Sequence, residues 1–250
     1  MRPRFALKPA AHLADPDRKR VLNEALFTVV APRYDAITRL LSFGRDRAWK
    51  DRLVAMLPPL DAPACLDLAC GTGDLARRLA RRYPAGHVLA LDLTPAMIAL
   101  ARERGGGDRL RFEIGDMGRT EQAGAAFDVV TGGYALRNAG DLDEALAEVV
   151  RVLKPGGVAA FLDFSKPRGR TAQRFEHRLL KLWGGLWGLA LHGNADVYGY
   201  IADSLARFPD RAALADRYRA AGFHIERTRR FFGGMIELAL LRKPAADGRA

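Results

Sequence analysis

Residues 64–83, ACLDLACGTGDLARRLARRY, contain the pattern that most restricts how this chain can fold. Residues 64–69 form a short apolar run of the length that a buried parallel strand takes. A glycine turn, Gly71-Thr72-Gly73, follows, and from Asp74 the apolar residues recur at helical spacing. Because glycine has no Cβ, a ligand can approach the backbone of such a turn closely. The stretch predicts a strand, a turn and a helix that bind a nucleoside-bearing cofactor.

The side chains around the turn predict a cofactor that carries positive charge. The turn has neither the third glycine of a dinucleotide fingerprint nor the lysine of a P-loop. Asp67 and Asp74 flank it, and carboxylates repel a pyrophosphate but attract ammonium and sulfonium groups. The next strand, residues 87–92, ends in Asp92, 21 residues after Gly71, where a carboxylate can bind ribose hydroxyls. These features predict S-adenosylmethionine; the alternative is an ordinary helix cap at Asp74 and a chance acid at Asp92.

The order of the remaining patterns predicts a doubly wound, mostly parallel α/β sheet. Residues 17–60 indicate a helical cap before the first strand, and residues 168–206 indicate a helical insertion after the fifth. A helix and an antiparallel pair of strands then close the sheet. Residues 1–16, with three prolines, are predicted to be a flexible arm, and residues 17–250 a single domain. The further predicted elements are strands at 110–114, 126–131, 158–164, 224–232 and 235–241, and helices at 94–104, 142–153 and 209–218.

Composition narrows the class of protein. The net charge of +11 comes from 33 Arg and 7 Lys spread along the chain, without an RNA-binding module, so we expect no nucleic-acid partner. Cys65 and Cys70 lie in or beside the first strand, which predicts buried thiols in a cytoplasmic protein rather than a disulfide. Their spacing is not a zinc pattern, and we predict no metal site. No apolar run reaches 18 residues and no secretory signal is visible, so no transmembrane helix is expected.

One segment of the insertion suggests contact with a membrane. The stretch around Trp183 and Trp187 is rich in Leu and Gly and lies beside Arg174, Arg178 and Lys181. This composition predicts peripheral, salt-sensitive binding to the anionic inner face of a membrane. A lid packed on the protein's own core is the alternative. A homodimer is also compatible with the sequence.

Several motifs give the chain a resemblance to the ubiquinone/menaquinone biosynthesis C-methyltransferases along most of its length. The glycine loop and the KPGG of RVLKPGG are shared by many methyltransferases, whereas the others are more specific to this family. The matching residues are Arg33-Tyr34-Asp35, Ser42-Phe43-Gly44, Trp49-Lys50, Gly71 to Asp74, Leu136-Arg137-Asn138, Arg151 to Gly157, Phe164 to Pro167, Tyr198, Tyr200, Ser204 and Phe208-Pro209.

The resemblance implies a Rossmann-like class I methyltransferase with a seven-stranded sheet whose last strand is antiparallel. It implies a membrane-soluble quinol as the methyl acceptor. Cofactor contacts are expected at Asp67, Gly71, Thr72, Gly73, Asp92, Leu93, Asp116, Met117 and Gly133, the last through its backbone only. Arg137 is the expected catalytic residue, stabilising a phenolate or activating a water, with Asn138 orienting it. Tyr34, Asp35, Tyr134 and Tyr200 are expected to line the acceptor pocket.

The chain departs from the family pattern at positions that bear on the acceptor. Thr38-Arg39 replaces an asparagine and an aspartate, Asp46 stands where histidine is frequent, and Gly133 replaces a serine. Tyr134-Ala135 replaces Phe-Gly, and residues 236–239, ending in Ala239, replace Val-Ala-Leu-His. Three functions follow: a quinol C-methyltransferase, a methyltransferase acting on another aromatic or polyketide-like acceptor, or a non-catalytic subunit of a quinone-synthesis assembly. The intact acidic and glycine residues of the cofactor half disfavour the third.

Overall fold

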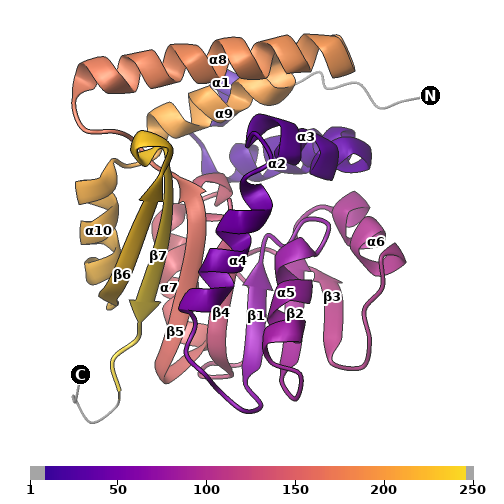
Figure 1. Ribbon diagram of the computed structural model, residues 1–250, viewed down its shortest axis with the longest axis vertical. Coiled ribbons are helices and arrows are strands. Elements are labelled where there is room, and N and C mark those ends of the chain that lie inside the picture. The colour runs from indigo at the N-terminus through magenta and orange to yellow at the C-terminus, as the bar shows by residue number, and fades with distance from the viewer. Residues whose placement is uncertain (1–8, 246–250) are drawn as a thin grey trace.

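The computed structural model describes residues 9–245 and contains a seven-stranded sheet in the order β3-β2-β1-β4-β5-β7-β6 (Figure 1). Strands β1 to β5 are parallel, whereas β7 runs antiparallel to both β5 and β6. This confirms the predicted doubly wound sheet with an antiparallel last strand. The strands are β1 Ala64–Leu68, β2 His87–Asp92, β3 Leu110–Ile114, β4 Phe127–Gly133, β5 Leu153–Phe164, β6 His224–Phe231 and β7 Ile236–Arg242.

Helices cover both faces of the sheet, so its central strands are apolar on both sides. Alternate residues of β4 show this: Val129 packs into one apolar core and Val130 into the other. The first core lies under α4, α5 and α6, and the second under α7 and α10. The bounds of these helices are α4 Asp46–Met56, α5 Asp74–Arg82, α6 Pro95–Glu103, α7 Leu142–Val152 and α10 Arg211–Ala220.

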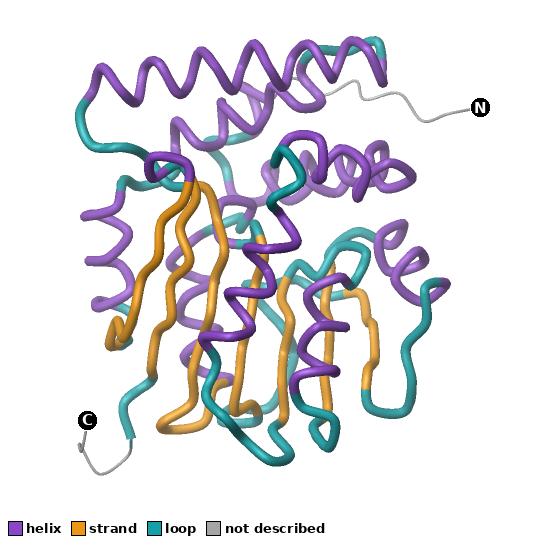
Figure 2. Tube along the Cα trace, in the orientation of Figure 1, coloured by secondary structure: helices purple, strands orange, loops and turns teal. Residues whose placement is uncertain are grey.

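A further layer of helices lies across the carboxyl ends of the parallel strands, as Figures 1 and 2 show. It combines the N-terminal helices with the two helices of the insertion, α8 and α9, which pack against each other. A third apolar cluster, including Leu22, Leu26, Met97 and Tyr200, holds this layer together. Its elements are α1 Pro9–His12, α2 Pro16–Val30, the 3₁₀ turn Ala31–Arg33, α3 Tyr34–Leu41, α8 Arg170–His192 and α9 Asp196–Arg207.

Apart from shifts of one or two residues at the ends of other elements, the structure differs from the sequence prediction at two places. β5 begins at Leu153 rather than at residue 158, because Leu153 pairs with Phe127 of β4 across a register shift. The Lys-Pro-Gly-Gly run therefore lies within a strand, where Gly156 adopts a φ of +77°. In addition, residues 9–12 of the predicted arm form α1, and Leu13 is buried; the rest of the arm, residues 1–8, lies outside the described residues.

Within residues 9–245, the helices are all too short or too polar to span a bilayer.

Candidate active site

The residues predicted to bind the cofactor gather at the carboxyl ends of β1, β2, β3 and β4, where an open parallel sheet binds its ligands. They line two small adjoining cavities of about 50 and 20 Å³ that share Tyr34, Ala69 and Gly133. The larger cavity is lined by Gly71, Asp92, Leu93, Asp116, Met117 and Gly133 among others, and the smaller one by Asp67, Thr72 and Gly133. The tertiary structure thus brings together eight of the nine residues expected at the cofactor.

Asp92 connects the second strand to the glycine turn. One carboxylate oxygen accepts a hydrogen bond of 2.8 Å from the backbone N–H of Gly71, and the other accepts one of 2.8 Å from Thr94. Burial raises the pKa of this carboxyl, while the two N–H donors oppose that rise. A carboxylate has about four acceptor sites, so this one can also accept from an incoming hydroxyl donor.

Asp67 is fully buried at the end of β1. Its Oδ1 accepts a hydrogen bond of 2.7 Å from the hydroxyl of Thr131, and its Oδ2 has no hydrogen-bond partner among the described residues. Burial raises the pKa of this carboxyl to about 7. A buried, unpartnered carboxylate oxygen fits a positively charged group such as the ammonium of S-adenosylmethionine.

Asp116, which also lines the larger cavity, is held by the guanidinium of Arg20. The Nε of Arg20, on α2, lies 2.6 Å from Oδ2 of Asp116, and the same guanidinium pairs with Glu144. Asp116 Oδ1 accepts from the backbone N–H of Gly118 at 2.9 Å. The N-terminal helices therefore help to shape the cofactor site, since Arg20 comes from outside the sheet.

Tyr34 separates the two cavities and lies over the glycine turn. Its ring would be 3.4 Å from a Cβ added at Gly71, and it lines both cavities. Burial raises the pKa of its hydroxyl to about 12, so the ring stays neutral.

Two of the expected residues lie elsewhere. Gly73 does not line either cavity; it has a φ of +80°, and a Cβ there would come within 2.5 Å of the Phe112 ring, so glycine is required for packing. Asp35 is exposed and does not line the cavity expected to bind the methyl acceptor, which is described below. Its carboxylate instead accepts a hydrogen bond of 2.7 Å from the Thr72 hydroxyl. It joins α3 to the glycine turn.

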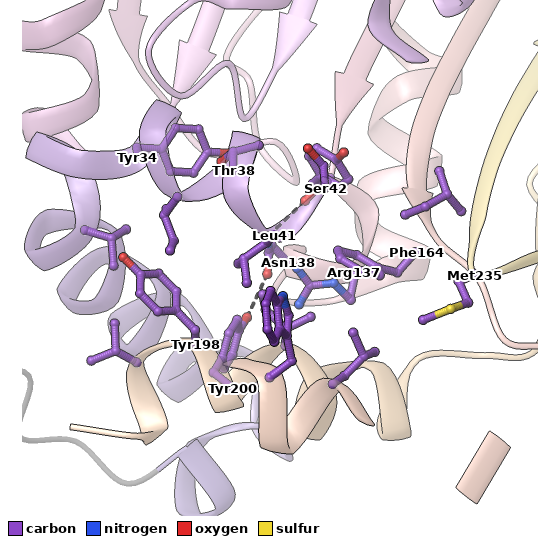
Figure 3. Close-up of a pocket in the computed structure, with 18 of the residues that line it drawn as sticks. Tyr34, Thr38, Leu41, Ser42, Arg137, Asn138, Phe164, Tyr198, Tyr200 and Met235 are labelled. Carbon is purple, nitrogen blue, oxygen red and sulfur yellow. Dashed lines mark hydrogen bonds between the residues drawn. The ribbon is translucent and has the colours of Figure 1, made fainter. Parts of the chain in front are cut away.

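A separate, larger cavity of about 320 Å³, called the acceptor cavity below, lies under the helical layer (Figure 3). Its walls are mostly apolar and aromatic, and they include Tyr34, Tyr134 and Tyr200 as expected. Four of its lining residues, namely Phe27, Tyr34, Tyr134 and Asn138, also line the cofactor cavity. A molecule bound in this cavity therefore lies next to the cofactor.

Arg137 is buried in the wall of this acceptor cavity and is held from several sides. Its Nη1 donates to the hydroxyl of Ser204, and its Nε lies 3.7 Å from a carboxylate oxygen of Asp163. Asp163 also accepts from the backbone N–H of Arg137 at 3.0 Å. The guanidinium lies over the rings of Phe164 and Tyr200, with 5.3 and 5.6 Å to their centroids. These contacts fix a cation in apolar surroundings, where it can stabilise a developing negative charge.

Asn138 belongs to a buried polar network that links three helices. The hydroxyl of Tyr200 lies 2.7 Å from the amide oxygens of both Asn138 and Asn23, and Asn23 donates to the Asn138 carbonyl at 2.6 Å. The side chain of Asn138 donates to the carbonyl of Tyr134 at 2.9 Å. Asn138 thus orients the loop that carries Arg137 and Tyr134 rather than contacting the guanidinium.

Sequence reasoning missed several residues that complete the site. Asn23 follows the buried Leu22 on α2, and an amide within an apolar stripe is the signal that could have revealed it. Lys50 lies in a motif used for the resemblance, yet its pairing with Asp46 at 2.8 Å and with Asp74 at 3.2 Å was not foreseen. Ser204 also belongs to a motif used for the resemblance, yet its hydrogen bond to Arg137 was not foreseen. Arg20 carries no local signal, because only the helical layer brings it to Asp116.

The departures from the family pattern fall at different depths. Thr38 lines the acceptor cavity, and Gly133 lines the cofactor cavities with room for a side chain, since an added Cβ would be 3.6 Å from Leu75. Arg39 is exposed, and Ala239 is buried in the core beneath the sheet. Thr38 and Gly133 therefore alter cavity walls, whereas Arg39 and Ala239 do not.

The strand order, the acidic ends of β1 and β2 and the glycine turn define a class I S-adenosylmethionine-dependent methyltransferase. A solved S-adenosylmethionine-dependent methyltransferase from Mesorhizobium loti has the same fold, with a TM-score of 0.57 and 22% identity over 77% of this chain and 96% of that one. The chain belongs to the ubiE/COQ5 methyltransferase family, whose profile matches residues 15–241.

Two curated relatives are similar over most of their length. The demethylmenaquinone methyltransferase of Deinococcus radiodurans is 37% identical over 214 residues, which cover 83% of this chain and 86% of the relative. The 2-phytyl-1,4-naphtoquinone methyltransferase of Thermosynechococcus vestitus is 37% identical over 223 residues, which cover 88% and 98%. These relatives support a methyltransferase of quinone biosynthesis.

Proposed function

We propose that this protein transfers the methyl group of S-adenosylmethionine to a ring carbon of a lipid-soluble quinol. The observation that carries the proposal is the placement of Arg137, which is the one charged side chain among the described residues that line a mostly apolar cavity adjoining the cofactor cavity. Apolar and aromatic walls suit a quinol ring, and the cation suits the oxygen that becomes negative during the reaction.

The chain's own residues account for the steps around the methyl transfer. When bound, S-adenosylmethionine supplies an electrophilic methyl group; Asp67 and Asp92 would hold its ammonium and ribose. Phe27, Tyr34, Tyr134 and Asn138 line both cavities and so bring the acceptor cavity against the cofactor cavity. Arg137 stabilises the phenolate, whose charge spreads to the ring carbon that is methylated. Such positioning can contribute up to about 7–11 kcal/mol of barrier reduction.

Quinone profiling by mass spectrometry tests this function. We expect a strain that lacks the gene to accumulate a quinone without its ring methyl group, and the wild-type gene to restore the methylated quinone. An Arg137→Ala gene should fail to restore it. An unchanged quinone profile in the deletion strain would contradict the proposal.

A different acceptor is the second candidate, and Thr38 is the observation that favours it. This departure lines the acceptor cavity, so it changes the surface that a substrate meets. An aromatic or polyketide-like molecule of similar size would fit the same apolar walls. Purified enzyme that methylates such a molecule, but no demethylated quinol, would establish this alternative.

We also propose peripheral contact with a membrane through the exposed face of α8. Five apolar side chains of this helix are exposed at spacings that place them on one face: Phe175, Leu179, Leu182, Leu186 and Leu189. Leu179 also lines the acceptor cavity with Trp183, and Trp183 stacks on the exposed Phe43 with 5.6 Å between ring centroids. The mouth of the cavity therefore meets this face, which would let an isoprenoid tail remain in lipid while the ring enters. A second copy of the chain on the same face, giving a homodimer, is the competing occupant.

A further inference from the structure

The acceptor cavity contains no obvious base for the proton that a quinol hydroxyl must lose. Among the described residues that line it, the polar side chains are those of Ser, Thr, Asn, Tyr, Trp and Arg. Arginine stays protonated, with a pKa above ~12. A hydroxyl of the cavity wall that is hydrogen-bonded to a base outside the cavity can carry this proton away.

Tyr134 makes this connection. It lines both the acceptor cavity and the cofactor cavity, and its hydroxyl donates a hydrogen bond of 2.9 Å to Oδ1 of Asp46, a carboxylate that is 6% exposed. Tyr134 and Asp46 are 88 residues apart, and both depart from the pattern of the family. The two departures are thus partners in one contact.

The backbone of Tyr134 is held in an unusual conformation that aims its ring. Its φ is +59°, in the left-handed region that a bulky residue rarely adopts. Its N–H donates to Leu162 at 2.6 Å, and its carbonyl accepts from the side chain of Asn138 at 2.9 Å. These bonds secure both ends of the residue, so the hydroxyl is positioned rather than free to swing.

Asp46 in turn pairs with a buried lysine of its own helix. Its other oxygen lies 2.8 Å from Nζ of Lys50, and the same ammonium lies 3.2 Å from Asp74, whose side chain is 38% exposed. The charged or titratable groups that face Tyr134 and Asp46 are Lys50 from α4, Tyr34 from α3, Asp74 from α5 and Asp163 from β5.

We propose that Tyr134 and Asp46 form a proton relay that removes the hydroxyl proton of the acceptor, an inference that rests on the proposed methylation of a quinol. The O–H bond of the quinol breaks, and its proton passes to the Tyr134 oxygen. At the same time the proton of Tyr134 passes to Oδ1 of Asp46. The electron pair of the broken bond stays on the quinol oxygen and makes the ring carbon nucleophilic. Asp46 ends protonated, and Tyr134 is regenerated.

The exchange has to be concerted. Burial, together with the neighbouring Asp46 carboxylate, raises the pKa of Tyr134 well above its ordinary value. A free tyrosinate is therefore unfavourable at this position, whereas a simultaneous transfer through the hydroxyl never creates one. In this scheme Tyr134 is the catalytic residue, and Asp46 acts through it as the proton acceptor.

The test compares Tyr134→Phe, Asp46→Asn and the double variant with the wild-type enzyme, using a demethylated naphthoquinol as the acceptor. We expect each single variant to lose about 100-fold or more in kcat, the scale of removing a general base. The double variant should lose no more than the worse single variant, because the two residues act in series. The Kd for S-adenosylmethionine should stay within about twofold, since Tyr134→Phe keeps the ring that lines the cofactor cavity and Asp46 does not line it.

The pH profile separates a relay from a structural role. Without the relay the quinol must ionise by itself, so kcat of the variants should rise about tenfold per pH unit toward the phenolic pKa near 10. The wild-type kcat should depend on pH far less steeply. Tyr83→Phe is the matched control, because it removes a buried tyrosine hydroxyl bond of 2.7 Å, to Pro58, away from both cavities. It should lower Tm without changing kcat or its pH profile.

The outcomes distinguish the two proposals. If the wild-type enzyme does not methylate the quinol, the proposed function fails. If the wild-type enzyme is active and Tyr134→Phe keeps its kcat and pH profile, the relay alone is overturned. The relay would also be overturned if the losses in kcat of the two single variants multiply in the double variant. It would likewise be overturned if kcat falls only in proportion to Tm while the pH profile stays unchanged.

Discussion

The backbone N–H of Gly71 donates a hydrogen bond of 2.8 Å to the carboxylate of Asp92, so the glycine turn and the end of the second strand form one unit. Asp92 therefore has two tasks, since it shapes the turn and presents acceptor oxygens to the cofactor cavity. Loss of its carboxylate removes both.

We predict that Asp92→Ala weakens S-adenosylmethionine binding by about 1–3 kcal/mol through loss of charged hydrogen bonds. Asp92→Asn keeps one acceptor oxygen, so its loss should be smaller. Isothermal titration calorimetry on variants whose folding is confirmed by circular dichroism measures the effect. An unchanged affinity in folded Asp92→Ala would exclude Asp92 as a cofactor ligand.

Cofactor binding should depend on pH through Asp67. Burial raises the pKa of this carboxyl to about 7, and the ionised form is the one that attracts a cationic ligand. The Kd should thus be lowest above pH 7 and should rise by up to about tenfold per pH unit below it. Titrations between pH 5.5 and 8.5 measure this dependence, and Asp67→Asn should remove it. A wild-type Kd that stays constant across this range would argue against Asp67 as the partner of the ammonium.

The same carboxyl should affect the stability of the free protein. The pKa of Asp67 is higher in the folded state than the value near 4 expected in the unfolded chain. Its favourable contribution is therefore complete below about pH 4 and is lost as pH rises through about 7. Asp67→Asn should raise Tm relative to wild type more at pH 8 than at pH 5. An equal change in Tm at both pH values would contradict this expectation.

Arg137 should matter for turnover more than for cofactor binding. Arg137→Ala is expected to lower kcat by about 100-fold or more, the scale of losing one anion-stabilising donor. Arg137→Lys should recover only part of the loss, because an ammonium cannot pair with Ser204 and the acceptor in the same forked geometry. If Arg137 only bridged Asp163 and Ser204, the Ala variant would instead lose Tm and cofactor affinity together. Measuring kcat, Kd and Tm on one preparation separates the two roles.

The exposed face of α8 should bind anionic vesicles. Leu182 and Leu186 are 75% and 55% exposed, so their replacement by Glu should not disturb the core. The double Glu variant should no longer sediment with anionic vesicles at low salt, because it loses apolar contact and gains negative charge. Val21→Glu, at an equally exposed residue of α2, is the matched control. If the wild-type protein does not bind vesicles but forms a dimer, and the double Glu variant is a monomer, the face instead binds a second copy of the chain.

Gly73 should be intolerant of any side chain. Alanine at this position would meet the Phe112 ring at 2.5 Å and would have to adopt a φ of +80°. Gly105→Ala is the matched control, because Gly105 has a φ of +93° with open space around it. The control should lower the free energy of unfolding by roughly 1–2 kcal/mol through backbone strain alone. Gly73→Ala should lower it by about 1–3 kcal/mol more because of the clash. Urea unfolding measures both, and equal costs would show that Phe112 moves freely.

Local sequence patterns were enough to predict the sheet and to bring most of the expected cofactor residues to one edge of it. Apolar runs of strand length alternate with helical patterns, and parallel strands place their carboxyl ends at one edge. Asp67, Gly71 and Asp92 could therefore be assigned to one site before any contact was known. Each lies within a residue or a few residues of a strand end, and such positions are set by local pattern.

The way in which the helical layer completes the site depends on long-range packing that local patterns do not encode. Tyr200 meets Asn23 across 177 positions of sequence, Arg137 meets Ser204 across 67, and Tyr134 meets Asp46 across 88. Hydrophobic periodicity shows which face of a helix is buried, but not which polar side chain of another helix it will meet. Those contacts depend on how α2, α4 and α9 pack over the sheet, since a shift of one helical turn, about 5.4 Å, would exchange every partner. For the same reason Asp35, although its motif was recognised, lies at the glycine turn rather than in the acceptor cavity.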